Sequence, residues 1–75
     1  MSEHEIKTII LNAFKSKSIL GNIAPDQDFF DVGASSLTVV DLQIQIEEQL
    51  QRSVPTSKLM ANPTINGWVE HYIAA

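Results

Sequence analysis

The chain has 75 residues, with nine acidic and five basic side chains and no cysteine. A chain of this length forms one domain at most, and folding buries only about 60% of the surface that the unfolded chain exposes. The absence of cysteine excludes a disulfide framework and a thiolate metal site, and a net charge of −4 opposes the phosphate neutralisation that drives nucleic-acid binding.

The sequence contains no basic, apolar leader of signal-peptide length. Its longest apolar runs are far below the roughly 20 residues needed to span a bilayer. We therefore expect a cytoplasmic protein with neither membrane nor nucleic-acid partners. Because Met1 is followed almost directly by a capped helix, we expect residues 1–75 to be one free-standing domain.

The first predicted helix runs from Glu3 to about Lys17. Ser2 and Glu5 form a capping-box pattern, in which each side chain accepts a hydrogen bond from the other residue's backbone N–H. Lys15 and Lys17 are placed where cations complement the negative end of a helix. The apolar residues recur at helical spacing: Ile6, Ile9, Ile10, Ala13 and Phe14.

Residues 18–35 have no sustained period and contain Gly21, Pro25 and Gly33, which predicts a loop. Loops of this length are usually functional or held by their own apolar residues. The residues that can hold this one are Ile19, Leu20, Ile23, Phe29 and Phe30. We interpret Phe29 and Phe30 as a plug in the core.

Three aspartates in this loop, Asp26, Asp28 and Asp31, raise the possibility of a calcium site. The EF-hand pattern requires an acidic or amide residue where Phe30 stands, glycine where Asp31 stands and glutamate where Leu37 stands. The calcium interpretation therefore fails at three positions. We expect Asp31 instead to cap or orient the loop ahead of the next helix.

The second predicted helix, about Ser36 to Gln51, carries two apolar stripes. At 100° per residue, one stripe contains Val39, Leu42, Ile46 and Leu50, and the roughly opposite stripe contains Leu37, Val40 and Ile44. The first stripe is more continuous and should face the core, which leaves the second available to another molecule. The alternative is a helix that runs through the middle of the domain and buries both stripes.

Two further helices complete an all-α chain. Thr56 is placed to cap a short third helix over about Ser57 to Ala61, and Asn62-Pro63 ends it. Thr64 is placed to cap the fourth helix. Its apolar face follows at helical spacing: Ile65, Trp68, Val69, Tyr72 and Ile73.

The segment Asp28-Phe29-Phe30-Asp31-Val32-Gly33-Ala34-Ser35-Ser36-Leu37 resembles the attachment site of acyl and peptidyl carrier proteins. Their pattern is roughly Phe-Phe-Asp-x-Gly-x-x-Ser-Leu, and by this register Ser36, rather than Ser35, receives the 4'-phosphopantetheine arm. Judged from the residues alone, either serine could be only a helix cap. A serine in the first turn of a helix also suits a phosphodiester, because free N–H groups and the helix dipole attract it.

The resemblance extends over the whole chain and implies an all-α, four-helix bundle of carrier-protein type, with a long loop between helices 1 and 2 and a short third helix. It implies that a phosphopantetheinyl transferase moves the arm from coenzyme A to Ser36, and that the arm then holds acyl or aminoacyl groups as thioesters. The Phe29-Phe30-Asp31 sequence is more similar to polyketide and nonribosomal peptide carriers than to fatty-acid carriers.

Partner enzymes of such a carrier load, condense or tailor its cargo, and the carrier itself is a monomer without catalytic activity. The residues that the resemblance and the charge pattern assign to partner docking are Leu37, Val40, Ile44, Asp41, Glu47 and Glu48. Ser35 departs from the family pattern, which usually has an acidic residue or histidine there. This departure lowers the negative charge beside the attachment residue.

Two other classes of function remain as alternatives. An unmodified helical adaptor would bind a partner through Leu37, Val40 and Ile44. A small serine hydrolase would use Ser36, but the chain lacks the Gly-x-Ser-x-Gly nucleophile elbow. His4 and His71 lack the spaced ligands of a metal site.

Overall fold

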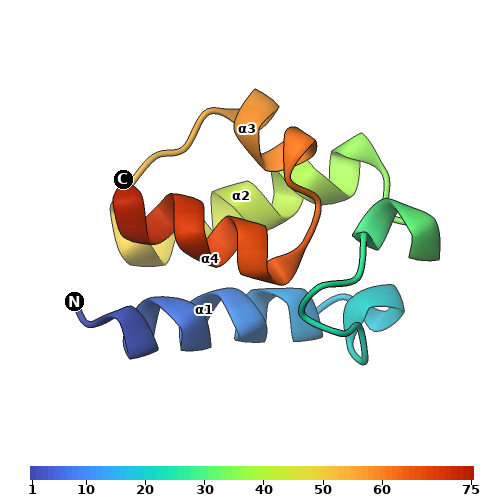
Figure 1. Cartoon of the computed structure of the whole chain (residues 1–75), viewed down its shortest axis with the longest axis horizontal. Coiled ribbons are helices and arrows are strands. Elements are labelled where there is room, and N and C mark those ends of the chain that lie inside the picture. Colours follow the sequence, from blue (N-terminus) through green and yellow to red (C-terminus); the bar gives the residue numbers. More distant parts are fainter.

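The computed structural model describes residues 1–75 as four α-helices and two short 3-10 helices, with no strands. These elements are α1 (Glu3–Lys15), η1 (Ser18–Leu20), η2 (Phe29–Val32), α2 (Ser36–Leu50), α3 (Thr56–Ala61) and α4 (Ile65–Ala74). Helix α1 packs against α2 and α4, and α3 packs against α2 and α4 (Figure 1). The predicted all-α bundle, with its long first connection and short third helix, is confirmed. None of its helices combines the length and the apolar character needed to cross a membrane.

The capping box predicted at the start of α1 is present. The Ser2 hydroxyl accepts the N–H of Glu5 at 3.1 Å, and the Glu5 carboxylate accepts the N–H of Ser2 at 3.3 Å. The hydrogen bond from the backbone of Ser2, joined by the one from its hydroxyl, holds the pKa of Glu5 below its usual value. The helix ends at Lys15, two residues before the prediction, so Lys17 lies beyond the helix rather than in its last turn.

A cluster of aromatic rings fills the space between α1, α4 and the long loop. Phe14 and Trp68 meet edge to face with centroids 5.1 Å apart, and Phe29 meets Trp68 at 5.6 Å. Such edge-to-face pairs add to the free energy gained by burying the rings. The Trp68 indole N–H donates to the Leu59 carbonyl at 3.0 Å, so its polar edge is satisfied while it joins α4 to α3.

The loop between α1 and α2 is more regular than the sequence predicts, because η1 and η2 lie within it. It is held to the start of α4 by two backbone hydrogen bonds, from Phe29 N–H to Pro63 O at 2.9 Å and from Asn66 N–H to Pro25 O at 3.0 Å. Phe29 is fully buried, as the plug interpretation expects, but Phe30 is 37% exposed, so that part of the interpretation is wrong. Among the other anchors expected for the loop, Leu20 is buried, Ile23 is partly buried, and Ile19 is half exposed.

The caps of the last two helices differ from each other. Thr64 accepts the N–H of Gly67 at 2.9 Å and caps α4 as predicted. Thr56 is the first residue of α3 rather than its cap, and its hydroxyl donates to the Gln43 side-chain oxygen at 2.7 Å. The threonine therefore joins α3 to α2, a pairing that its position in the sequence does not reveal.

Candidate functional site

The chain reaches the serine pair through η2 and a left-handed turn. The Asp28 carboxylate accepts the Phe30 N–H at 2.8 Å and caps η2, so Asp28, not the predicted Asp31, organises this segment. Gly33 ends η2 with φ of +104°, in the region that favours glycine. A Cβ at Gly33 would meet no atom within 4 Å, so the backbone angle alone selects glycine here. The turn directs the chain into α2.

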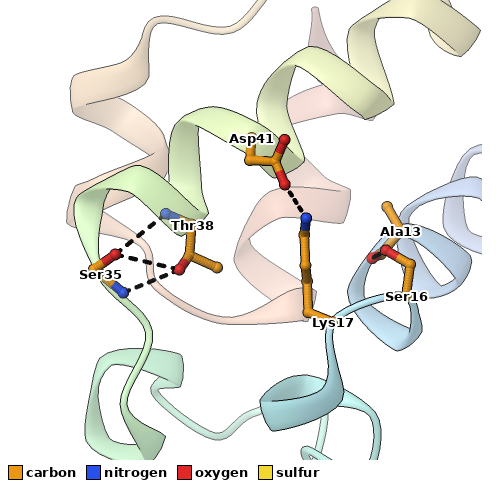
Figure 2. Close-up of polar contacts among 6 residues, drawn as sticks. All are labelled: Ala13, Ser16, Lys17, Ser35, Thr38 and Asp41. Atoms are coloured by element: carbon orange, nitrogen blue, oxygen red, sulfur yellow. Dashed lines mark hydrogen bonds and ion pairs between the residues drawn. The ribbon is translucent and has the colours of Figure 1, made fainter.

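Ser35 is the N-cap of α2. Its hydroxyl accepts the Thr38 N–H at 3.4 Å, and the Thr38 hydroxyl accepts the Ser35 N–H at 3.3 Å (Figure 2). This reciprocal pair is a capping box in which threonine stands at the position usually held by glutamate or glutamine. The Ser35 side chain therefore serves as the N-cap that stabilises the start of α2.

Ser36 is the first residue of α2, and its side chain is exposed. Its hydroxyl takes part in none of the hydrogen bonds that form the capping box. The N–H groups of Ser36 and Leu37 have no acceptor within the chain, as expected for the first turn of a helix. No acidic residue lies in this turn. An exposed hydroxyl beside free N–H groups and the positive end of the helix dipole fits a phosphodiester-linked arm.

Helix α2 presents the two predicted stripes to different surroundings. Val39, Leu42, Ile46 and Leu50 are buried. Leu37, Val40 and Ile44 are 80%, 40% and 56% exposed, respectively. The predicted division of the helix into a core face and an exposed apolar face is confirmed, and the alternative in which both stripes are buried is excluded.

The three acidic residues of α2 have three different environments. The Asp41 carboxylate forms an ion pair with the Lys17 ammonium group, which lies just before η1 (Figure 2). Glu47 is partly buried, and Glu48 is exposed. They therefore do not form a continuous acidic rim.

Glu47 belongs to a network inside the bundle. Its carboxylate accepts the Tyr72 hydroxyl at 2.9 Å and the Val54 N–H at 3.1 Å, and Gln43 donates to the Val54 carbonyl at 2.9 Å. Burial, with the hydrogen bond to Glu47, raises the pKa of Tyr72. This network gives Glu47 a structural role that the docking prediction did not foresee. Tyr72 lies 25 residues away in sequence, so no local pattern could have indicated it.

No pocket surrounds Ser36. The two surface cavities are lined by other segments, and His4 and His71 line different ones. Ser36 lines neither cavity, so neither His4 nor His71 shares a cavity with its hydroxyl.

A helical bundle that presents a free serine hydroxyl at the start of its second helix, beside an exposed apolar face, has the features of a carrier. The family model described as "Phosphopantetheine attachment site" matches residues 8–72, so the chain belongs to this family. The family is defined by covalently attached 4'-phosphopantetheine, and its members are carriers that work with partner enzymes.

Two curated proteins are similar to the chain. It is 28% identical over 54 residues to N-(5-amino-5-carboxypentanoyl)-L-cysteinyl-D-valine synthase of Amycolatopsis lactamdurans, covering 72% of this chain and 2% of the synthase. It is 36% identical over 53 residues to the hybrid PKS-NRPS synthetase phm1 of Pyrenochaetopsis sp., covering 71% of this chain and 1% of the synthetase. The chain thus corresponds to a small part of each relative. No solved structure matches it.

Proposed function

We propose that Ser36 is the attachment residue and that the chain carries acyl or aminoacyl groups in polyketide or nonribosomal peptide biosynthesis. The observation that carries this proposal is that the two serines have different hydrogen-bonding roles. Ser35 uses its hydroxyl to cap α2, whereas Ser36 presents an exposed hydroxyl that the cap does not use. The names of the two relatives, a synthase of a cysteinyl-valine peptide and a PKS-NRPS synthetase, support the choice of pathway.

The reaction at Ser36 is a phosphoryl-group transfer to its side-chain oxygen. The bond from Oγ to the phosphorus of the phosphopantetheine unit forms, the phosphoanhydride bond of coenzyme A breaks, and adenosine 3',5'-bisphosphate leaves. The serine proton passes to a base of the transferase, since this chain places no such group in the first turn of α2. The free N–H groups of Ser36 and Leu37 can donate to the new phosphodiester.

When bound, the arm supplies a terminal thiol that holds the cargo as a thioester. The chain itself contributes presentation, because a tethered group reaches successive active sites at a high effective concentration. The exposed side chains of Leu37, Val40 and Ile44 offer a small apolar contact for loading, condensing and tailoring enzymes. A small contact suits partners that must exchange. We propose no catalytic activity for the chain, a monomeric state and a cytoplasmic location.

Intact mass spectrometry tests the attachment residue. The wild type, Ser35→Ala and Ser36→Ala are each incubated with coenzyme A and a broad-specificity phosphopantetheinyl transferase. We expect the wild type and Ser35→Ala to gain the mass of one phosphopantetheine group and Ser36→Ala to gain none. The opposite pattern in the two variants would move the site to Ser35, and an unchanged wild-type mass would favour the unmodified adaptor.

A further inference from the structure

The apolar side chains exposed on α2, Leu37, Val40 and Ile44, form what we term the docking surface. At 100° per residue, Asp41 lies along one side of this stripe and Glu47 along the other. Charges at these two positions flank any partner seated on the stripe. Whether each of these two carboxylates is paired with a cation therefore decides which partner surface complements the stripe.

Both flanking carboxylates have partners inside the chain. Asp41 is paired with the Lys17 ammonium group, and Glu47 accepts hydrogen bonds from Tyr72 and Val54. Glu48 is the remaining acidic residue of α2 and is exposed. It lies twelve positions beyond Ser36, about 18 Å along the helix. The donors to Glu47 are uncharged, so Asp41 is the acidic residue of α2 whose charge is offset by a cation, and it is also the one nearest to Ser36 in the helix.

The backbone of Lys17 is held in place beside α2. Its N–H donates to the Phe14 carbonyl at 3.1 Å, and its carbonyl accepts the Leu20 N–H at 2.9 Å. These bonds fix the residue at the junction between α1 and η1. Its side chain is 28% exposed and that of Asp41 is 60% exposed, so a partner can approach the pair.

We propose that Lys17 is a specificity-determining residue that neutralises Asp41 and so removes one negative charge from the side of the docking surface on which Asp41 lies. The partner that fits it is an enzyme whose contact patch is apolar opposite the stripe and places no basic side chain opposite Asp41. This inference rests on the proposed carrier function. It adds that a residue outside α2, 24 positions before Asp41, selects among partners by charge.

The first test uses a probe of known charge, a broad-specificity phosphopantetheinyl transferase with a basic docking face. The apo forms of the wild type, Lys17→Met, Asp41→Asn and the double variant are compared by kcat/KM at low and high salt. Lys7→Met is the matched control, because it removes one exposed lysine that has no ion pair. Circular dichroism verifies that each variant is folded.

We expect Lys17→Met to raise kcat/KM about threefold at low salt, the effect of one unit charge acting at about 6 Å in water. Asp41→Asn should lower it by a similar factor, and the double variant should have the wild-type salt dependence. These differences should vanish near 1 M salt, where the Debye length is about 3 Å. Equal effects of Lys17→Met and Lys7→Met would overturn the proposal, because net charge alone would then explain them.

A second test measures the electrostatic potential at the docking surface without any enzyme. Cationic and anionic nitroxide probes relax nearby protons according to the local potential, and the methyl protons of Val40 and Ile44 report it. We expect a potential that is more negative in Lys17→Met than in the wild type. A wild-type potential as negative as that of Lys17→Met would refute the role of Lys17. Failure of the wild type to gain mass would instead refute the carrier function, so the two failures are distinguishable.

Discussion

The two faces of α2 make a sharp prediction, because Ile44 and Ile46 are the same residue type two positions apart. Ile46 is fully buried, whereas Ile44 is 56% exposed. We expect Ile46→Ala to lower the free energy of unfolding by about 2–5 kcal/mol, through lost apolar burial and the cavity left behind. A chain of this size has a total stability of about 4–11 kcal/mol, so this variant should lose a large part of it.

Ile44→Ala is the matched control. Surface substitutions usually change stability by less than about 0.5 kcal/mol, and alanine has the higher helix propensity. Urea denaturation and thermal melting, both followed by far-UV circular dichroism, measure the two variants. Each kcal/mol corresponds to about 4–8 °C in Tm for a domain of this size, so Ile46→Ala should melt at least about 8 °C below Ile44→Ala.

The same pair should show the reverse order in docking. Ile44→Ala should slow phosphopantetheine transfer per folded molecule, since side chains at the centre of a small interface carry much of its binding energy. Ile46→Ala should transfer normally per folded molecule. If Ile44→Ala melts as early as Ile46→Ala and its transfer kinetics stay normal, the assignment of an exposed docking surface is refuted.

Three further predictions follow from the site and the core. Ser35→Ala should lose about 0.5–2 kcal/mol of stability through the missing cap, whereas Ser36→Ala should melt like the wild type. Equal losses in the two variants would show that Ser35 is not the cap. Gly33→Ala should cost about 1–3 kcal/mol because its φ of +104° is strained for alanine, with chemical denaturation as the measurement. The pKa of Tyr72 is raised above its usual 10.0, so above about pH 10 the unfolded chain loses this proton while the folded chain keeps it. Wild-type stability should therefore fall with rising pH by up to about 1.4 kcal/mol per unit relative to Tyr72→Phe, and parallel pH profiles would contradict this.

Short-range patterns account for what the sequence predicts correctly. The capping box of Ser2 and Glu5 and the cap at Thr64 involve residues three positions apart, so the contacts follow once the helix forms. The two stripes of α2 follow in the same way, since helical periodicity fixes which side chains share a face. The attachment register also comes from one contiguous segment ending at Leu37, and the choice of Ser36 stays a prediction.

Contacts between distant segments account for what the sequence does not predict. Phe29 and Phe30 are neighbours of the same type, yet only the packing of η2 against the bundle decides that Phe29 is buried and Phe30 is exposed. Thr56 has the sequence signature of a cap, but Gln43 lies close enough to take its hydrogen bond. In each case the local preference is weak, and a neighbour supplied by the tertiary structure determines the outcome.

The charge of the docking surface shows the same division most clearly. The sequence by itself determines that α2 carries Asp41, Glu47 and Glu48 and that an apolar stripe lies among them. Only the tertiary structure brings Lys17 to Asp41 and Tyr72 to Glu47, from 24 and 25 residues away. A helix fixes the directions of its own side chains through the backbone, but whether a carboxylate is free or paired depends on which groups the folded chain places beside it.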